Sequence, residues 1–166
     1  MTAMTWTITP EPPDSPTATA LWRAYYTEVS DRYYLLHEGR RTAPDELERE
    51  IAAHTGDDLR LPKGQLLVAR HNDTPAGSAG VRLLAPETAE LTRVFIHKPM
   101  RGKGGAPLLI QTAEHTPRTL GAPRIILDTR HDLTEARALY TKLGYEETPP
   151  HNNDPYAEHW FTKPLH

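Results

Sequence analysis

The chain has 166 residues, a formal net charge of -3 and no cysteine. The charge argues against a general nucleic-acid or membrane-surface binder, and the missing cysteine excludes disulfides, thiolate nucleophiles and cysteine-ligated zinc. The length suits one domain over residues 1–166, and the absence of a signal peptide or long apolar segment leads us to expect a cytoplasmic protein.

The first third of the chain carries the patterns of one strand and two helices. Alternating polar and apolar residues predict a short strand over 5–8. Apolar and aromatic residues then recur every three to four positions over 18–34, which predicts a helix capped by Asp14 or Ser15. We expect the aromatic stripe of this helix to belong to the core. A second helix is predicted to start near Thr42, with Pro44 and acidic residues in its first turn.

The remainder of the chain predicts mainly strands, with two further helices. Short turns separate three strands over 65–70, 76–84 and 89–96, which favours an antiparallel meander. A helix over 105–120 follows, then a buried strand of parallel character over 124–129. A helix over 134–143 and strands over 145–147 and 156–163 complete the pattern. The predicted fold is α/β (α+β), with a mixed, mostly antiparallel sheet of about six to seven strands and about four helices.

A glycine-rich turn connects the third strand of the meander to the next helix. It comprises Arg101-Gly102-Lys103-Gly104-Gly105-Ala106, and Pro107 follows it. Glycines let the backbone approach an anion, the first amides of a helix lack internal partners, and the helix dipole favours negative charge there. The turn therefore predicts a phosphate site. The glycines alone do not exclude the alternative, which is an ordinary basic surface turn between a strand and a helix.

A second motif occupies the last predicted helix and reads Ala136-Arg137-Ala138-Leu139-Tyr140-Thr141-Lys142-Leu143-Gly144-Tyr145. Together with the glycine-rich turn and the order of elements, it resembles the GNAT superfamily of acetyl-CoA-dependent N-acyltransferases over nearly the whole chain. The resemblance implies a GNAT-like fold. It also implies an N-acetyltransferase that moves an acetyl group from acetyl-CoA to a primary amine by direct attack, without a metal.

The resemblance also implies a site for acetyl-CoA. Its pyrophosphate would lie on Arg101, Gly102, Lys103, Gly104, Gly105 and Ala106, and its pantetheine arm would pair with Val94, Phe95 and Ile96 like an added strand. A splay between that strand and the next would free a backbone amide for the carbonyl oxygen. Two residues depart from the family pattern. Leu133 stands where members commonly carry Asn, and Gly105 stands where many carry an aliphatic residue, so we expect a looser phosphate loop and one altered contact.

Two residues are candidates for proton transfer. Tyr140 occupies the position from which, by resemblance, a tyrosine protonates the leaving thiolate; a packing role is the alternative. Glu90 lies six residues before Ile96, where several relatives point a carboxylate that deprotonates the amine through water. A solvent-facing glutamate at a strand start and a water relay stay open as alternatives. The 9 histidines are scattered and predict no metal site.

The acceptor site is expected among tyrosines of the first helix and polar residues near the end of the chain. The candidates are Tyr25, Tyr33, Arg93, Asp128, Asp154 and Glu158. Asp154 and Glu158 could hold a cationic amine, with help from aromatic faces. A polar surface loop is the alternative for these two residues. We expect Arg82 and Arg93 to pair with Glu90 or Asp128, and Asp128 to support the site. The alternatives for the two arginines are that they face each other across adjacent strands or bind a carboxylate of the acceptor.

The predicted acceptor is a small, polar, cationic metabolite or an antibiotic-like compound. Two other functions remain open: a protein or peptide N-acetyltransferase, and a catalytically inactive acetyl-CoA-binding regulatory module. The partners are therefore a small-molecule amine and acetyl-CoA, with no nucleic acid and no membrane. A homodimer through the last strand, over 156–163, is also left open.

Overall fold

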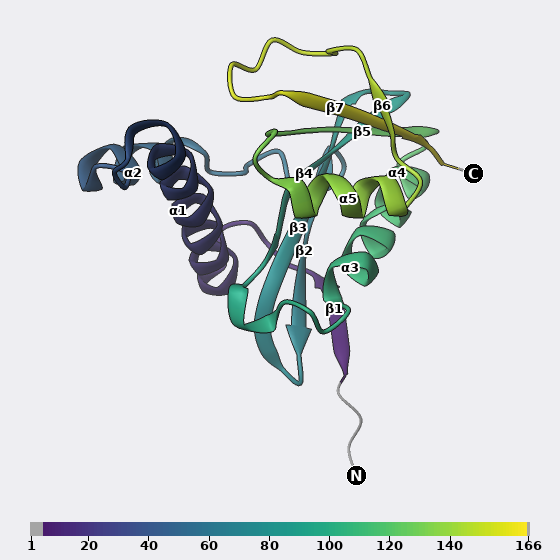
Figure 1. The fold of residues 1–166 in the computed structure, drawn as a ribbon. Coiled ribbons are helices and arrows are strands. Elements are labelled where there is room, and N and C mark those ends of the chain that lie inside the picture. Colours follow the sequence, from purple (N-terminus) through teal and green to yellow (C-terminus); the bar gives the residue numbers. More distant parts are fainter. Residues whose placement is uncertain (1–4, 166) are drawn as a thin grey trace.

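A seven-stranded sheet runs through the molecule in the order β1-β2-β3-β4-β5-β7-β6 (Figure 1). The computed structural model describes residues 5–165. The strands are β1 (Trp6–Pro10), β2 (Gly64–His71), β3 (Thr74–Ala85), β4 (Thr88–Ile96), β5 (Arg124–Thr129), β6 (Glu146–Thr148) and β7 (His159–Pro164). All neighbouring strands are antiparallel except β4 and β5. The mostly antiparallel sheet and the parallel character of β5 are confirmed.

Helices cover both faces of the sheet. The helices are α1 (Pro16–Glu38), α2 (Pro44–Ala53), α3 (Gly105–Ala113), α4 (His115–Thr119) and α5 (Thr134–Lys142), with a short 3-10 turn, η1, over Lys98–Met100. The first two lie on one side of the sheet, and the other three lie on the opposite side (Figure 1). No helix within residues 5–165 has the length and apolar character needed to cross a bilayer.

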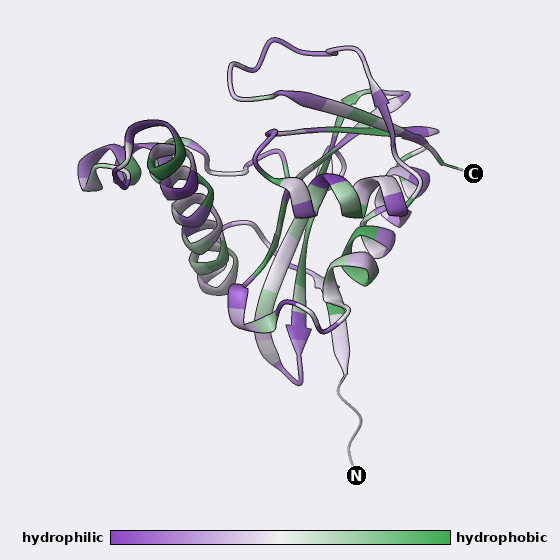
Figure 2. Cartoon of the chain, in the orientation of Figure 1, coloured by the Kyte–Doolittle hydropathy of each residue, from purple (hydrophilic) through white to green (hydrophobic). Residues whose placement is uncertain are grey.

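The alternation of side chains along β2 divides the core between these two faces. Leu66 and Val68 pack with buried residues of α1, whereas Leu67 and Ala69 join the larger cluster that contains Leu109 of α3. Successive residues of a strand point to opposite faces, so an unbroken apolar run is needed where both faces are covered. Hydrophobic residues accordingly gather in the central strands and in α3 (Figure 2).

One predicted helix is divided in two. The predicted helix over 105–120 forms α3 and α4, which meet at Glu114, because Pro117 has no amide to donate to the carbonyl four residues earlier. The second helix, α2, begins at Pro44, two residues after Thr42, near which its start was predicted. Thr42 is buried, with its hydroxyl 2.7 Å from that of Ser30.

The last strand starts later than predicted and lies inside the sheet. Asp154 forms a turn, in which its carboxylate accepts from the Tyr156 amide at 2.8 Å and its carbonyl from the Ala157 amide at 3.2 Å. The strand therefore begins at His159. Because β7 pairs with both β5 and β6, it offers no free edge for the homodimer considered from the sequence. The edge strands are β1 and β6.

A buried ion pair joins the end of α3 to β7. The Glu114 side chain is 4% exposed, and its carboxylate lies 3.0 Å from Nζ of Lys163. The Tyr145 hydroxyl donates to the same carboxylate at 2.8 Å. Removing one partner of such a pair leaves a charge in a medium that solvates it poorly.

We expect Lys163→Met to lower the free energy of unfolding by about 3 kcal/mol, because the buried Glu114 carboxylate loses the ammonium group that pairs with it. Urea unfolding followed by circular dichroism measures this loss. Lys142→Met is the matched control, since Lys142 is exposed and lies at the end of α5. Equal stability of the two variants would show that the Glu114 pair does not stabilise the fold.

Candidate active site

β4 and β5 separate part-way along their length. They pair only at Thr88 with Arg124, Ala89 with Ile125 and Glu90 with Ile126. β4 continues to Ile96 and β5 continues to Thr129. Beyond Glu90, the edge of β4 that faces β5 therefore has no strand partner. The splay expected from the sequence is present, and it leaves backbone groups of β4 available to a bound molecule.

A β-bulge in β4 lies beside this splay. Ser78 pairs with Phe95 but Gly80 pairs with Thr92, so β4 carries one extra residue. Arg93 adopts a positive φ of 54° there, which bends the strand. Its guanidinium lies 3.8 Å over the Trp22 ring and donates to the carbonyl of His54 at 2.7 Å. Arg93 thus ties β4 to α1 instead of forming the expected ion pair with Glu90 or Asp128.

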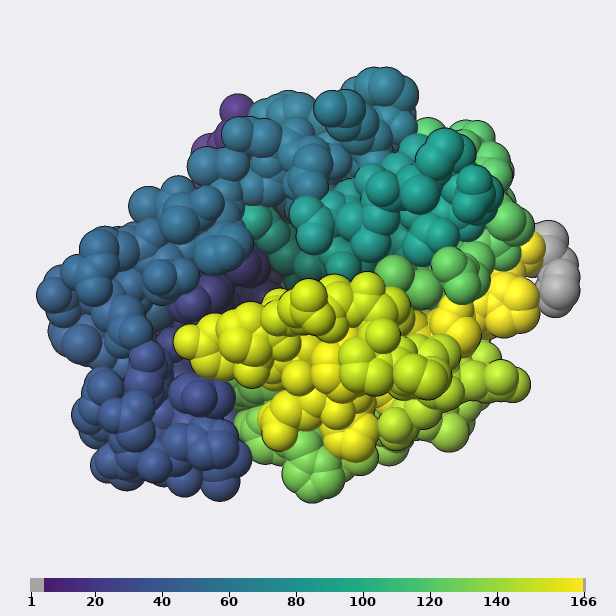
Figure 3. Space-filling model, turned by 90° about the horizontal axis from the view of Figure 1, so that it is seen from above, coloured from purple at the N-terminus to yellow at the C-terminus, as the bar shows by residue number. Residues whose placement is uncertain are grey.

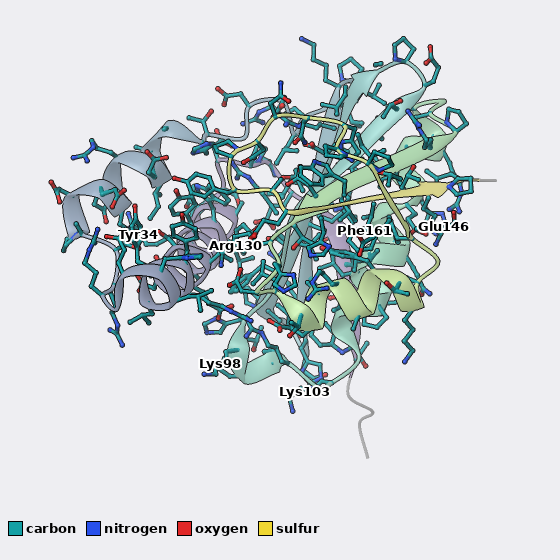
Figure 4. The ribbon with its side chains drawn as sticks, turned by 45° about the horizontal axis from the view of Figure 1, so that its top comes forward. Tyr34, Lys98, Lys103, Arg130, Glu146 and Phe161 are labelled. Carbon is teal, nitrogen blue, oxygen red and sulfur yellow. The ribbon has the colours of Figure 1, made fainter. Side chains whose placement is uncertain are left out.

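The glycine-rich turn presents unpartnered backbone amides. Gly102 and Gly104 have φ values of 77° and 83°, a left-handed conformation that glycine adopts without strain. The amides of residues 102–106 donate to no acceptor in the described part of the chain. Lys98 and Lys103 lie at this end of the molecule (Figure 4) and form no ion pair within residues 5–165. The turn fits an anion such as a phosphate group.

Trp6 of β1 supports the turn from the protein side. Its indole nitrogen donates to the Lys103 carbonyl at 2.9 Å. A Cβ added at Gly105 would lie 2.4 Å from carbons of the Trp6 ring. Gly105 therefore makes room for the indole, and the turn is braced where we expected it to be looser. Sequence reasoning missed this role, because nothing local links residues 97 positions apart.

Arg101 connects the turn to β4 and to α1. Its Nε donates to the Ile96 carbonyl at 2.8 Å, and one Nη lies 2.5 Å from a carboxylate oxygen of Glu28. The side chain is partly exposed, and its charge is shared with Glu28. Of the three cations at this end, Lys98 and Lys103 are therefore the ones without an ion-pair partner in the described residues.

A cleft of about 1000 Å³ opens on the other side of the splay. In Figure 3 it is the hollow between the blue surface that includes α2 and the yellow surface of the loop before β7. Its aromatic lining is Trp22, Tyr25, Tyr26, Tyr33, Tyr34 and Tyr156. The aromatic stripe of α1 thus forms a cleft wall, and only Ala18 and Leu21 of that helix are buried. The core role expected for the stripe holds in part for Tyr25, which packs against the buried cluster of Leu21, Val68 and Phe95, and is wrong for the other aromatic residues.

Most of the predicted acceptor residues meet in this cleft. Tyr25, Tyr33, Arg93, Asp128 and Asp154 all line it. Glu158 does not line the cleft; its carboxylate accepts from the backbone amide of His131 at 3.2 Å. The structure therefore gives Glu158 a role in holding the loop that follows β5.

Carboxylates outnumber cations in the cleft. The acidic residues are Glu46, Glu50, Asp57, Asp58, Asp128 and Asp154, and the arginines are Arg82, Arg93 and Arg130. Among these acids, within the described residues, only Asp58 forms an ion pair, with Arg82 at 2.8 Å. Arg130 is itself paired with Asp132 at 2.9 Å. Sequence reasoning missed Glu46, Glu50 and Asp57, because acidic residues in and after an amphipathic helix look like an ordinary solvated face.

Tyr140 of α5 is buried, but its hydroxyl is not enclosed. The residue is 7% exposed, and its ring packs against Tyr145 and Phe161. The hydroxyl makes no hydrogen bond in the described part of the chain, yet it is not among the fully buried polar atoms that lack a partner there. Burial, with smaller contributions from Tyr25 and Asp128, raises the pKa of Tyr140. Tyr140 therefore keeps its proton and can donate it.

Comparison with known families and structures identifies the family of this chain. A model described as the acetyltransferase (GNAT) family matches residues 18–145. The chain belongs to the GNAT acetyltransferase family. A GNAT acetyltransferase from Staphylococcus aureus Mu50 has a TM-score of 0.74 and 14% identity, with 98% of this chain and 100% of that chain covered.

Two similar structures were solved with ligands. The PaiA N-acetyltransferase from Thermoplasma acidophilum, in complex with coenzyme A, has a TM-score of 0.71 at 16% identity, covering 98% of this chain and 100% of that chain. A GNAT acetyltransferase from Elizabethkingia anophelis with acetyl-CoA bound has a TM-score of 0.62 at 16% identity, covering 96% and 98%. At these identities the likeness establishes the fold. The comparison with curated proteins found no match.

Glu90 of this GNAT protein is held inside an ion-pair chain. Its side chain is 11% exposed, and Oε1 lies 2.8 Å from Nε of Arg82, which also contacts Asp58. Burial raises the pKa of Glu90, while Arg82 opposes that rise. Arg82 thus forms the ion pair expected from the sequence. Glu90 does not line the cleft, whereas Leu133, at the start of α5, does.

No group of three or more histidine, aspartate or glutamate side chains in residues 5–165 is arranged to hold a metal ion. The nearest approach of two histidines is at His131 and His159, whose ring nitrogens lie 2.9 Å apart. His159 also contacts Glu147 at 3.3 Å. This pair connects the loop after β5 to the first residue of β7.

A double-mutant cycle tests the packing of the glycine-rich turn in this GNAT protein. We expect Gly105→Ala to destabilise the native protein by about 1–3 kcal/mol, because the new methyl group overlaps the Trp6 ring. In a Trp6→Ala background the same change should cost clearly less, giving a coupling of about 1 kcal/mol or more. Thermal unfolding of the four proteins provides the measurement, and strictly additive effects would contradict the contact.

Proposed function

We propose that this protein transfers an acetyl group from acetyl-CoA to a primary amine of a small, cationic molecule, by direct attack in a ternary complex. One observation carries the proposal: the splay between β4 and β5 has an anion site at one end and an acidic, aromatic cleft at the other. The Thermoplasma acidophilum and Elizabethkingia anophelis structures, solved with coenzyme A and acetyl-CoA, support the same donor here.

The residues on the donor side fit coenzyme A. The free amides of residues 102–106, with Lys98 and Lys103, would hold the pyrophosphate. The unpaired edge of Val94, Phe95 and Ile96 would bind the pantetheine arm through backbone hydrogen bonds. Acetyl-CoA supplies the acyl group as a thioester. The lack of cysteine agrees with attack by the amine itself instead of by a thiol of the enzyme.

We propose that Tyr140 donates a proton to the leaving thiolate. Its raised pKa keeps the phenol neutral throughout the physiological range, so it is present as a donor. Its hydroxyl has no competing partner within residues 5–165. α5 therefore supplies the acid from one side of the splay.

The cleft supports a cationic amine as acceptor. Five acidic residues line the cleft without forming an ion pair in the described chain: Glu46, Glu50, Asp57, Asp128 and Asp154. Aromatic faces line the same space, and each is worth about 0.5–2 kcal/mol to a cation, depending on its desolvation. The Tyr34 hydroxyl donates to Glu46 at 2.6 Å, which holds that carboxylate toward the aromatic wall. A second positive charge on the acceptor would find partners at the α2 end.

An amine panel tests the proposed function. Thiol release from acetyl-CoA is measured with monoamines, diamines and lysine-containing peptides. We expect diamines to react with the highest kcat/KM, because the cleft holds more than one free carboxylate. Preference for peptides would favour the protein or peptide acetyltransferase. Tight binding of coenzyme A without any transfer would favour the inactive regulatory module.

Replacement of Tyr140 tests its proposed role as the proton donor. We expect Tyr140→Phe to lower kcat by about 100-fold or more, since positioned proton donors contribute that much to acyl transfer. The dissociation constant of coenzyme A, measured by calorimetry, should change by less than about twofold. Equal turnover by the variant would remove Tyr140 from the mechanism, and a loss confined to coenzyme binding would assign it a packing role.

A further inference from the structure

Asp128 lies where the donor site meets the acceptor cleft. It follows Ile126, the last β5 residue paired with β4, by two positions, so both side chains share one face of the strand. It also lines the cleft. Its charge acts on groups from three other elements, namely Glu90 of β4, Tyr25 of α1 and Tyr140 of α5. Asp128 is therefore the cleft carboxylate whose charge acts on the proposed acid.

Asp128 has no counter-ion of its own. Within residues 5–165 it forms no ion pair, and its one hydrogen bond comes from the side-chain amide of Asn152, at 2.8 Å from Oδ2. Glu90 differs, because Arg82 already neutralises it. A half-buried carboxylate without a cation is costly to hold. The ammonium group of an acceptor would supply the missing charge.

Asn152 holds the carboxylate in one orientation. The indole nitrogen of Trp160 donates to Asn152 Oδ1 at 3.0 Å, and the Asp154 amide donates to the same oxygen at 3.2 Å. Because an indole N–H can only donate, the oxygen of Asn152 must face Trp160, and its NH₂ must face Asp128. This arrangement engages Oδ2 of Asp128 and leaves Oδ1 without a protein partner in the described residues.

We propose that Asp128 binds the acceptor's ammonium group and accepts its proton, and that Asn152, fixed by Trp160, is the residue that positions Asp128. This rests on the proposed function and exchanges the roles that we expected for Glu90 and Asp128. Glu90 then serves to hold Arg82 in the wall of the cleft.

The proposed step balances in protons, electron pairs and bonds. The ammonium nitrogen gives one proton to Asp128, and its freed electron pair forms the C–N bond as the C–S bond breaks. The electron pair of the broken bond stays on sulfur, which takes the Tyr140 proton. The second proton lost by nitrogen restores Tyr140, and Asp128 releases its own proton to water. Each transfer thus yields the amide, the thiol and one proton.

Asp128→Asn is the decisive variant, because the new side chain has the same shape and can still accept from Asn152. Binding of 1,5-diaminopentane is measured by calorimetry on enzyme saturated with coenzyme A, which cannot transfer an acyl group. We expect binding to weaken about tenfold or more in this variant. Asp45→Asn is the matched control, because Asp45 is exposed and does not line the cleft, and it should change the affinity by less than about twofold. Glu90→Gln is measured beside it, to compare Asp128 with the carboxylate expected from the sequence.

Steady-state kinetics with the amine provide a second readout. We expect Asp128→Asn to lower kcat/KM for the amine about 100-fold, because the proposed base is lost. Asn152→Ala should raise the KM for the amine and leave the KM for acetyl-CoA within about twofold, because Asp128 loses the hydrogen bond that orients it toward the acceptor. A merely structural Asn152 would leave the KM for the amine unchanged. This variant also tests the proposal if Asp128→Asn folds poorly.

Thermal midpoints and coenzyme A affinity serve as controls for correct folding. Native-like amine binding and a native-like kcat/KM for the amine in Asp128→Asn would overturn this assignment while the acetyltransferase function stands. A loss of both in Glu90→Gln instead would assign the base to Glu90. Absence of transfer to any amine by the native enzyme would overturn the proposed function, and with it the assignment of Asp128.

Discussion

The separation of β4 from β5 beyond Glu90 is the constraint on which the rest of the site depends. Parallel strands require a crossover, and here α3 and α4 provide it, so the N-terminus of α3 follows directly from the end of β4. The crossover therefore brings the free amides of the glycine-rich turn to the same end of β4 as its unpaired edge. Had the pairing continued to Thr129, β5 would occupy that edge and leave no backbone groups for a ligand.

α1 couples the two halves of this site. Its Glu28 pairs with Arg101 of the glycine-rich turn, and the carbonyl of Val29 accepts from Arg130 at the end of β5, at 2.7 Å. Figure 4 shows Arg130 between α1 and the sheet. Trp22 of the same helix holds the Arg93 bulge. The helix that forms the aromatic wall of the cleft is thus fastened at three points to the segments that frame the donor site.

Local patterns were sufficient to predict most of the fold and the donor side of the site. Alternation and turn residues located all seven strands, and the glycine-rich turn is one continuous segment whose chemistry is visible in its own residues. The acceptor side could not be predicted in the same way. Glu46 and Asp128 are 82 positions apart and meet only through the fold. The amphipathic pattern of α1 correctly predicted a helix, but periodicity does not say whether its apolar face meets the core or a cleft.

Although the net charge is only -3, the molecule has two sites whose local charges are opposite in sign. Lysines and free amides make the end of β4 favourable to anions, whereas the cleft carries carboxylates in excess over arginines. For the substrates that we propose, a phosphate-bearing donor would therefore be drawn to one end of the splay and a cationic acceptor to the other, and each would be repelled from the other's end. Such a division would bring the two reacting groups together near the middle of the splay. Asp128 lines the cleft without an ion-pair partner in the described residues, and its charge acts on Tyr140. The charge pattern that would separate the proposed substrates is thus consistent with Asp128 as their base and Tyr140 as their acid.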